Sequence, residues 1–188
     1  MTDSPSGPGR GVIVAAAVVV VVLAVASGTL ATAVINRRRS RLNHAYGLVT
    51  CSTPHLAGST VEVALSDRGN SMMGRGPMMV TMQANPGSVG SGQVSFVVRN
   101  GGALVHELVV LPLPTDGPGT RPVGADGKID ESQSLGEASR SCAAGSGDGI
   151  APGSSGWVTL TLKPGRYELV CDEPWHYAAG MFDVLTVG

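Results

Sequence analysis

Two patterns of hydrophobic positions divide the chain. From Val12 to Ile35 no side chain is charged, and most of the residues are Val, Ala or Leu. From Leu42 onward, short runs alternate hydrophobic with polar residues or are rich in β-branched residues, and Gly, Pro and Asn separate these runs. The first pattern predicts a helix that is apolar on every side, whereas the second predicts a series of short β-strands.

The apolar N-terminal run is long enough to cross a bilayer, because a spanning helix needs about 20 residues. We therefore predict a short N-terminal tail over 1–11, a transmembrane signal-anchor helix over 12–36 and a linker over 37–59. The alternative is a signal peptide that is cleaved after Ala24-Val25-Ala26. The apolar run continues past that site, which favours the anchor.

The remainder, 60–188, reads as one all-β domain. Within it Tyr167, Leu169 and Cys171 share one strand face by period two. Short strands between Gly/Pro turns predict a β-sandwich. The stretch 112–156 is rich in Gly, Ser, Asp and Pro, so we expect a long loop insertion there, with one or two helical turns within 130–139. The segments with a strand pattern are 61–65, 78–83, 93–99, 106–111, 157–162, 167–171 and 182–187.

Composition and charge exclude several classes of protein. Only 14% of the 188 residues are charged and the net charge is −1, which excludes a charged coiled coil and a basic nucleic-acid binder. The net charge is the sum of two unlike parts, +4 over residues 1–41 and −5 over residues 42–188. An acidic domain predicts a basic patch on any protein that docks with it.

The candidate chemistry lies in one loop between the last two predicted strands, where the spacing is Cys171-x4-His176-x4-Met181. Sulfur ligands favour soft copper(I), and a trigonal His2Cys set with a weak axial Met makes an electron-transfer copper site. Such a set needs a second histidine. Among His44, His55, His106 and His176, His106 begins a predicted strand that can lie beside the strand ending at Cys171.

Each of these residues also has a plain explanation. A Cys on an apolar strand face is commonly a small buried hydrophobe, a Met after Gly is commonly a core residue, and His176 can be a surface residue. The copper interpretation is favoured because residue type, order, spacing and position between two strands all agree in one short segment.

This segment resembles the cupredoxin (plastocyanin/azurin) superfamily, and it is most similar to rusticyanin- and sulfocyanin-type blue copper proteins. The resemblance covers about 60–188 and implies a cupredoxin-like Greek-key β-sandwich that holds one type 1 copper ion. It implies equatorial ligands His106, Cys171 and His176 and the axial ligand Met181. One departure is Pro174-Trp175-His176 in place of the usual Pro-Gly-His, because Trp does not freely take the backbone angles open to Gly.

The resemblance implies an electron carrier that cycles between Cu(II) and Cu(I) without substrate turnover. We therefore expect no enzyme activity and no small-molecule substrate. Val170 and Asp172 flank Cys171, whereas a copper oxidase with a trinuclear centre needs His there, and a dinuclear copper site needs a second nearby Cys. Weak redox encounters use small interfaces. We expect the electron port to be an apolar patch formed by Pro174, Trp175, His176 and Tyr177.

A Met-rich segment supports a second interpretation, in which the protein handles copper as an extracytoplasmic chaperone or storage protein. Thioether sulfurs bind Cu(I), and the candidates for a secondary Cu(I) site are Met72, Met73, Met78, Met79 and Met82. The plainer interpretation, which we favour, is that Met78, Val80 and Met82 form the core face of a strand.

The remaining cysteines, Cys51 and Cys142, are predicted to form a disulfide. The alternative is two unrelated free thiols. A disulfide requires an oxidising compartment, and cupredoxins of this type usually work outside the cytoplasmic membrane.

The arginines around the apolar run favour a domain on the cytoplasmic side, in conflict with the disulfide and the copper chemistry. Arg10 precedes the run, whereas four arginines follow it, and the positive-inside rule would leave the domain in the cytoplasm. We give more weight to the copper chemistry and the disulfide. The expectation is a single-pass cell-membrane protein with its copper domain on the extracytoplasmic side, whose partners are redox proteins of a respiratory chain or oxidase.

Overall fold

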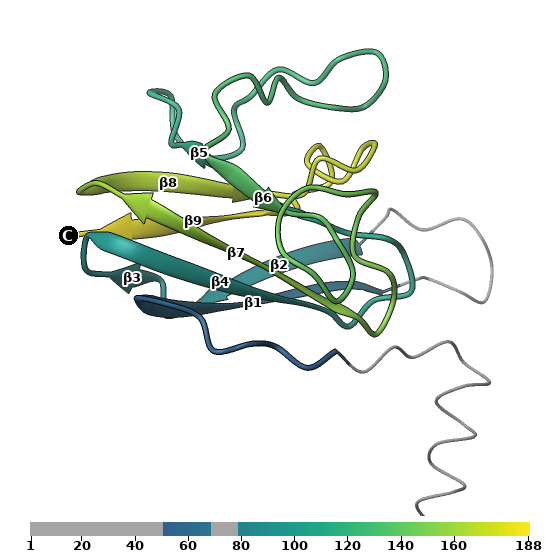
Figure 1. Ribbon diagram of the computed structural model, residues 1–188. Helices are drawn as coiled ribbons and strands as arrows, with labels where there is room; N and C mark the ends of the chain where they lie inside the picture. The colour runs from purple at the N-terminus through teal and green to yellow at the C-terminus, as the bar shows by residue number, and fades with distance from the viewer. Residues whose placement is uncertain (1–50, 69–78) are drawn as a thin grey trace, which may run out of the picture. The chain divides into compact units, whose positions relative to one another are not determined.

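The computed structural model describes residues 51–68 and 79–188, which form a sandwich of two β-sheets. One sheet has the strand order β2-β1-β4-β7 and the other has the order β3-β9-β8-β5-β6 (Figure 1). The strands in these ranges are β1 (Ser59–Arg68), β2 (Met79–Asn85), β3 (Ser88–Val89), β4 (Gly92–Asn100), β5 (Leu108–Pro112), β6 (Gly136–Ala138), β7 (Ser155–Leu162), β8 (Gly165–Val170) and β9 (Phe182–Val187). The prediction of an all-β sandwich is confirmed.

Strand pairing brings distant parts of the sequence together. β5 pairs antiparallel with β8, and Val109 lies opposite Val170. β1 pairs antiparallel with β2 and parallel with β4. Each of the seven predicted segments overlaps an observed strand, although β5 begins two residues after His106. The pairing of β5 with β8 places His106 and Cys171 at the same end of the sandwich, as the sequence predicts.

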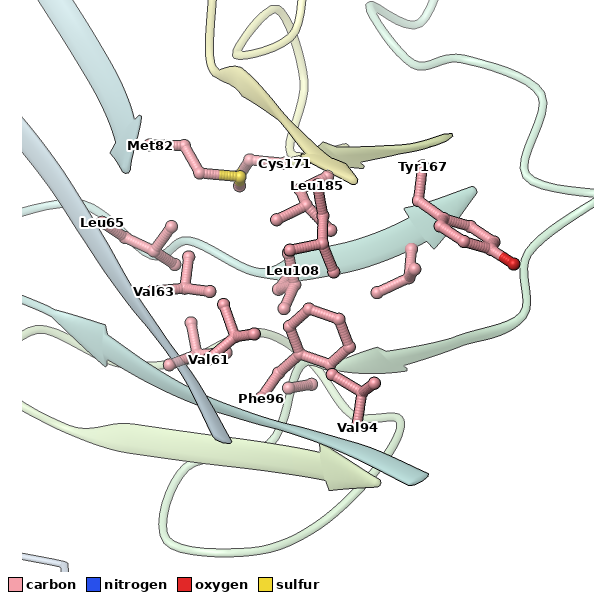
Figure 2. Close-up of a cluster of buried hydrophobic side chains, with 14 of the residues drawn as sticks. Val61, Val63, Leu65, Met82, Val94, Phe96, Leu108, Tyr167, Cys171 and Leu185 are labelled. Atoms are coloured by element: carbon pink, nitrogen blue, oxygen red, sulfur yellow. The ribbon is translucent and has the colours of Figure 1, made fainter. Parts of the chain in front are cut away.

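The main core lies between the two sheets. It is built by alternation along the strands, so that Val61, Val63 and Leu65 of β1 face inward while the residues between them face solvent. Figure 2 shows Phe96, which is fully buried, among Val61, Val94 and Leu108. Tyr167, Leu169 and Cys171 all belong to this core, as their period-two spacing predicts.

A smaller cluster lies on the opposite face of β5 and β8, and we call it the outer cluster. It explains why β5 is a continuous apolar run rather than an alternating one, since a strand covered on both faces needs apolar residues at every position. The segment that covers it is the connection between β5 and β6, residues 113–135, which we call the outer loop. The outer cluster consists of Val109, Leu111, Ile129, Val170 and Tyr177, with Val123 and Phe182 packed against it.

The stretch 112–156 is more ordered than the sequence indicates. It contains strand β6, which pairs with β5. Within 130–139 a single turn forms, in which the backbone N–H of Ser134 donates to the carbonyl of Glu131 at 2.7 Å, and it does not extend into a helix. The physical reason is non-local: the backbone N–H of Leu135 donates to the carbonyl of Val110 at 2.9 Å, which draws this segment to the sheet edge.

The predicted disulfide forms between Cys51 and Cys142, with an Sγ–Sγ distance of 2.08 Å. It ties the segment before β1 to the loop between β6 and β7. The same loop carries Ile150, whose backbone forms an antiparallel bridge with His106. The disulfide therefore secures a loop that contacts the proposed metal site.

Some predictions fall outside the described residues. These are the tail 1–11, the span 12–36 and the part of the linker before residue 51, together with Met72, Met73 and Met78. Across 51–68 and 79–188, the structure contains no helix with the length and hydropathy needed to cross a membrane.

Candidate metal centre

Three buried side chains from three parts of the chain converge at one end of the sandwich. His106 precedes β5, Cys171 follows β8, and His176 lies in the loop that joins β8 to β9. We call residues 171–181 the ligand loop. The two histidines are 0% and 5% exposed, and Cys171 is 0% exposed. Within the described ranges, this is the one group of at least three His, Cys, Asp or Glu residues whose ligand atoms lie close enough together to hold a metal ion.

The distances between the three ligand atoms suit a single first-row metal ion. Nδ1 of His106 is 3.2 Å from Nδ1 of His176. Sγ of Cys171 is 3.4 Å from Nδ1 of His176 and 3.9 Å from Nδ1 of His106. Bonds of about 2.0 Å to nitrogen and 2.3 Å to sulfur would separate trigonal ligands by roughly 3.4–3.8 Å. The three atoms therefore need little movement to share one ion.

His106 is oriented by a carboxylate on the side away from the centre. Its Nε2 lies 2.9 Å from Oδ1 of Asp67, near the end of β1. Because an ionised carboxylate can only accept a hydrogen bond, this contact places the imidazole hydrogen on Nε2 and leaves the lone pair of Nδ1 facing Cys171 and His176. No sequence pattern pointed to this pair, since 39 residues separate Asp67 from His106.

Asp67 is itself held in place by the turn that precedes His106. Its Oδ1 accepts the backbone N–H groups of Ala103 at 2.7 Å and Leu104 at 3.0 Å. Burial opposes ionisation, but these N–H groups and the His106 ring outweigh it, and the pKa of Asp67 lies below its usual value. Gly102 permits the close approach, because a Cβ there would lie 1.9 Å from Oδ1 of Asp67.

Cys171 is a buried thiol when no metal is bound. Burial raises the pKa of Cys171 to about 12, although the backbone N–H groups of Glu107 and Glu173 act in the opposite direction. The N–H of Glu107 donates to Sγ at 3.4 Å. The thiolate is the metal ligand, so a metal that binds here must displace the thiol proton.

Glu107 places a second ionisable group close to the centre. Its side chain is buried, and burial together with repulsion from Glu173 raises the pKa of Glu107 to about 7. Its backbone lies next to His106 and donates to Cys171. The carboxyl group is therefore partly protonated near neutral pH.

His176 lies in a loop made of turns rather than in a strand. Its backbone N–H donates to the carbonyl of Glu173 at 2.9 Å, and its own carbonyl accepts the N–H of Met181 at 3.0 Å. Burial, with the neighbouring ring of His106, lowers the pKa of His176 to about 4. The imidazole is therefore neutral at neutral pH, as a metal ligand must be.

Met181, the predicted axial ligand, closes the ligand loop. It is fully buried in the main core. Its backbone carbonyl accepts the N–H of Cys171 at 3.1 Å, so the first and last residues of the loop are joined. All four predicted ligands therefore belong to the same buried end of the sandwich.

Trp175 takes the left-handed backbone conformation that Gly would favour, with φ of 70°. A non-Gly residue in this region costs about 1–2 kcal/mol. The conformation is held by its backbone N–H, which donates to the carbonyl of Gly127 in the outer loop at 2.8 Å. Trp175 thus takes a left-handed conformation despite its bulk, and its side chain is 52% exposed.

The patch predicted as the electron port is only partly exposed, since His176 is itself 5% exposed. Pro174 and Trp175 are exposed, but Tyr177 is 3% exposed and belongs to the outer cluster. Its hydroxyl donates to the buried carboxylate of Glu168 at 3.0 Å, which turns the ring inward. Leu104 and Val105, which precede His106, are large exposed hydrophobic residues that the sequence did not single out.

The Met-rich segment receives little support as a single site. Met79 is exposed and Met82 is buried in the main core, because they point to opposite faces of β2. The favoured expectation that Val80 and Met82 face the core is confirmed. The other three methionines lie outside the described residues.

Comparison with known proteins agrees with the geometry. A family model described as the sulfocyanin (SoxE) domain matches residues 74–188, more than half of the chain. No match is found among the curated proteins.

Several solved structures are similar to this chain at low identity. A dithionite-reduced auracyanin from the photosynthetic bacterium Roseiflexus castenholzii is 22% identical, with a TM-score of 0.45, over 71% of this chain and 99% of that one. Auracyanin B is 23% identical, with a TM-score of 0.44, over 74% and 95%. The copper protein rusticyanin is 18% identical, with a TM-score of 0.43, over 79% and 94%.

Proposed function

Since the chain belongs to the sulfocyanin (SoxE) family of blue copper cupredoxins, we propose that it carries single electrons between redox partner proteins at one type 1 copper site. The observation that carries the proposal is the convergence of His106, Cys171 and His176, three buried ligands whose metal-binding atoms lie within 4.8 Å of one another. Bound copper would supply one-electron Cu(II)/Cu(I) chemistry there.

The protein side chains would keep the ligand geometry constant. His106 is held by Asp67 from behind, and Cys171 accepts the backbone N–H of Glu107. Met181 would be the fourth residue to hold copper, and the hydrogen bond between its carbonyl and Cys171 fixes both ends of the ligand loop. A site that is already assembled needs little rearrangement when its charge changes, which suits electron transfer.

Burial of the ligands favours electron transfer over substrate chemistry. None of the three is more than 5% exposed, so a substrate has little access to the ligand atoms. We propose that electrons enter and leave next to His176, past the exposed side chains of Pro174 and Trp175. The domain has a net charge of −5 over residues 42–188, which suits a partner with a basic surface.

We further propose that residues 12–36 anchor the protein in the cell membrane with the copper domain on the extracytoplasmic side. The disulfide between Cys51 and Cys142 supports this orientation, because disulfides persist in oxidising compartments. The proposed partners are components of a respiratory chain or oxidase. Protease digestion of intact cells would remove the domain if it is outside, whereas protection of the domain would contradict the orientation.

The visible absorption spectrum of the copper-loaded full chain tests the function. An intense thiolate-to-Cu(II) band is expected, and Cys171→Ser should abolish it because the sulfur ligand is lost. Cys51→Ser is the matched control and should keep the band, since Cys51 is paired with Cys142 rather than with the metal site. A colourless Cu(II) complex of the unmodified chain would contradict a type 1 site.

A further inference from the structure

A buried carboxylate lies beneath the outer loop, next to the ligand loop. Glu168 is fully buried and points from β8 to the same side as Val170, into the outer cluster. Its Oε1 accepts the backbone N–H of Gly119 at 2.7 Å and the hydroxyl of Tyr177 at 3.0 Å. Its Oε2 accepts Nε of Arg121 at 2.7 Å. The donors therefore come from the outer loop and from the ligand loop.

Arg121 closes this arrangement into a ring of hydrogen bonds. Its backbone N–H donates to the hydroxyl of Tyr177 at 3.1 Å, while its guanidinium pairs with Glu168 and also donates to the carbonyl of Pro112. The Arg121 side chain is 13% exposed. Each of Glu168, Arg121 and Tyr177 thus forms a hydrogen bond with the other two, so that none can move without breaking two of these bonds.

Stability alone does not require a charged pair at this position. Replacing a buried ion pair by apolar residues of similar volume is often neutral or stabilising, because both charges must leave water. A fixed geometry is what the charged pair adds, since its hydrogen bonds are directional. The nearest consequence of that geometry is the position of Tyr177, and Tyr177 directly follows His176.

The outer loop also forms hydrogen bonds with the ligand loop at two other points. The backbone N–H of Ile129 donates to Oδ1 of Asp172 at 2.7 Å, and that of Trp175 donates to the carbonyl of Gly127 at 2.8 Å. At the other end of the ligand loop, Phe182 follows Met181, and its ring centre is 5.5 Å from that of Tyr177. Two proposed ligands, His176 and Met181, are thus each followed by an aromatic residue that packs in the outer cluster.

We propose that Glu168 is a positioning residue for the metal centre. Through Arg121 and Tyr177 it fastens the outer loop to the ligand loop, and it holds His176 in its ligating position before any metal binds. This inference rests on the proposed function in one respect, namely that His176 is a ligand. The fastening itself is a property of the copper-free chain and can be measured without copper.

The test is amide hydrogen exchange of the full chain without copper, comparing the unmodified protein with Glu168→Gln. Gln keeps the shape of the side chain but removes the charge that binds Arg121. The reporters are the N–H groups of Trp175, Ala179 and Met181, each hydrogen-bonded to a backbone carbonyl. Their exchange should accelerate about ten-fold or more, as expected for loss of a charged hydrogen bond, while exchange in β1 and β4 stays unchanged.

Glu62→Gln is the matched control, because it removes the same charge from an exposed pair with Arg99 on the other sheet. It should leave the exchange of the three reporters unchanged. Tyr177→Phe is a milder second variant that removes only the hydroxyl, and it should accelerate the same three N–H groups without affecting β1 or β4. After copper loading, the visible band should shift in Glu168→Gln and stay in place in Glu62→Gln.

Two results would overturn the inference. One is unchanged exchange of the three reporters in both Glu168→Gln and Tyr177→Phe. The other is an equal acceleration throughout the domain, which would make Glu168 a general contributor to stability. Failure of the proposed function is a separate result, since it would show as the absence of the thiolate-to-Cu(II) band in the unmodified chain.

Discussion

The two histidines of the metal centre are held by opposite means. His106 is fully buried beside the sheet, its Nε2 is bonded to Asp67, and its backbone is bridged to Ile150. His176 lies in a loop of turns, and no residue in the described ranges forms a hydrogen bond with its Nε2. One ligand is fixed through its own ring, whereas the other is fixed through its neighbours along the backbone.

This difference assigns different roles to the two sides of the site. A carboxylate behind His106 acts on the electronic properties of the ring as well as on its orientation. The outer cluster behind Tyr177 acts only on where the ligand loop lies. Variants on the His106 side should therefore alter affinity and pH dependence, and variants on the His176 side should alter order in the loop.

The largest expected effect concerns Glu107, on the His106 side. Its pKa is about 7 in the folded chain and about 4.3 when unfolded. The pKa of Glu107 is higher in the folded chain than in the unfolded one. The contribution of this carboxyl group to the free energy of unfolding is therefore fully present below pH 4.3 and is lost as the pH rises through 7. Glu107→Gln does not titrate, so its free energy of unfolding relative to the unmodified copper-free protein should rise by about 3 kcal/mol between pH 4.3 and 8.

Urea denaturation at a series of pH values measures this difference. The control is Glu62→Gln, which removes an exposed carboxylate and should change the free energy of unfolding by no more than about 0.5 kcal/mol, as for most surface substitutions. A difference for Glu107→Gln that does not vary with pH would show that the buried carboxyl group stays ionised in the folded chain.

An intermediate effect is expected for Asp67→Asn. The amide is neutral, so it no longer raises the basicity of His106, and substitutions of this kind typically lower metal affinity about 10- to 100-fold. Copper affinity measured by competition with a chelator checks this. Asp183→Asn is the control, because Asp183 also accepts backbone N–H groups, including that of Ala84, but does not contact the metal centre. Equal affinities for the two variants would contradict a special role for Asp67.

The smallest effect is expected for Gly127→Ala, on the His176 side. Gly127 has φ of 84°, and an added Cβ would lie 2.8 Å from the backbone nitrogen of Trp175. Gly117→Ala is matched to it, since Gly117 lies in the same loop with φ of 99° and a Cβ there would meet nothing within 4 Å. Both variants should lose about 1–2 kcal/mol of stability from the backbone conformation.

Only Gly127→Ala should also disturb the ligand loop. Amide exchange of Trp175 and Met181 should accelerate in this variant and remain unchanged in Gly117→Ala. If both variants leave the exchange unchanged, the ligand loop does not depend on its contact with the outer loop, and the two histidines would be held independently.

The sequence by itself determined seven of the nine strands in the described residues and brought out the candidate ligands. Alternation of apolar residues is a local property, so it located seven strands, and the Cys171-x4-His176-x4-Met181 spacing identified the ligand loop. The pairing of Cys51 with Cys142 also followed once Cys171 was assigned to the metal. These features depend on residue type and spacing, which the sequence contains directly.

Only the tertiary structure decided which residues hold each ligand in place. Asp67 is 39 residues from His106, and Arg121 is 47 residues from Glu168, so no local pattern connects them. The inward position of Tyr177 follows from the Glu168 contact, and β6 forms only because the chain returns to the edge of β5. Burial makes such polar partners necessary, but which residues supply them depends on the way the loops fold back over the sheet.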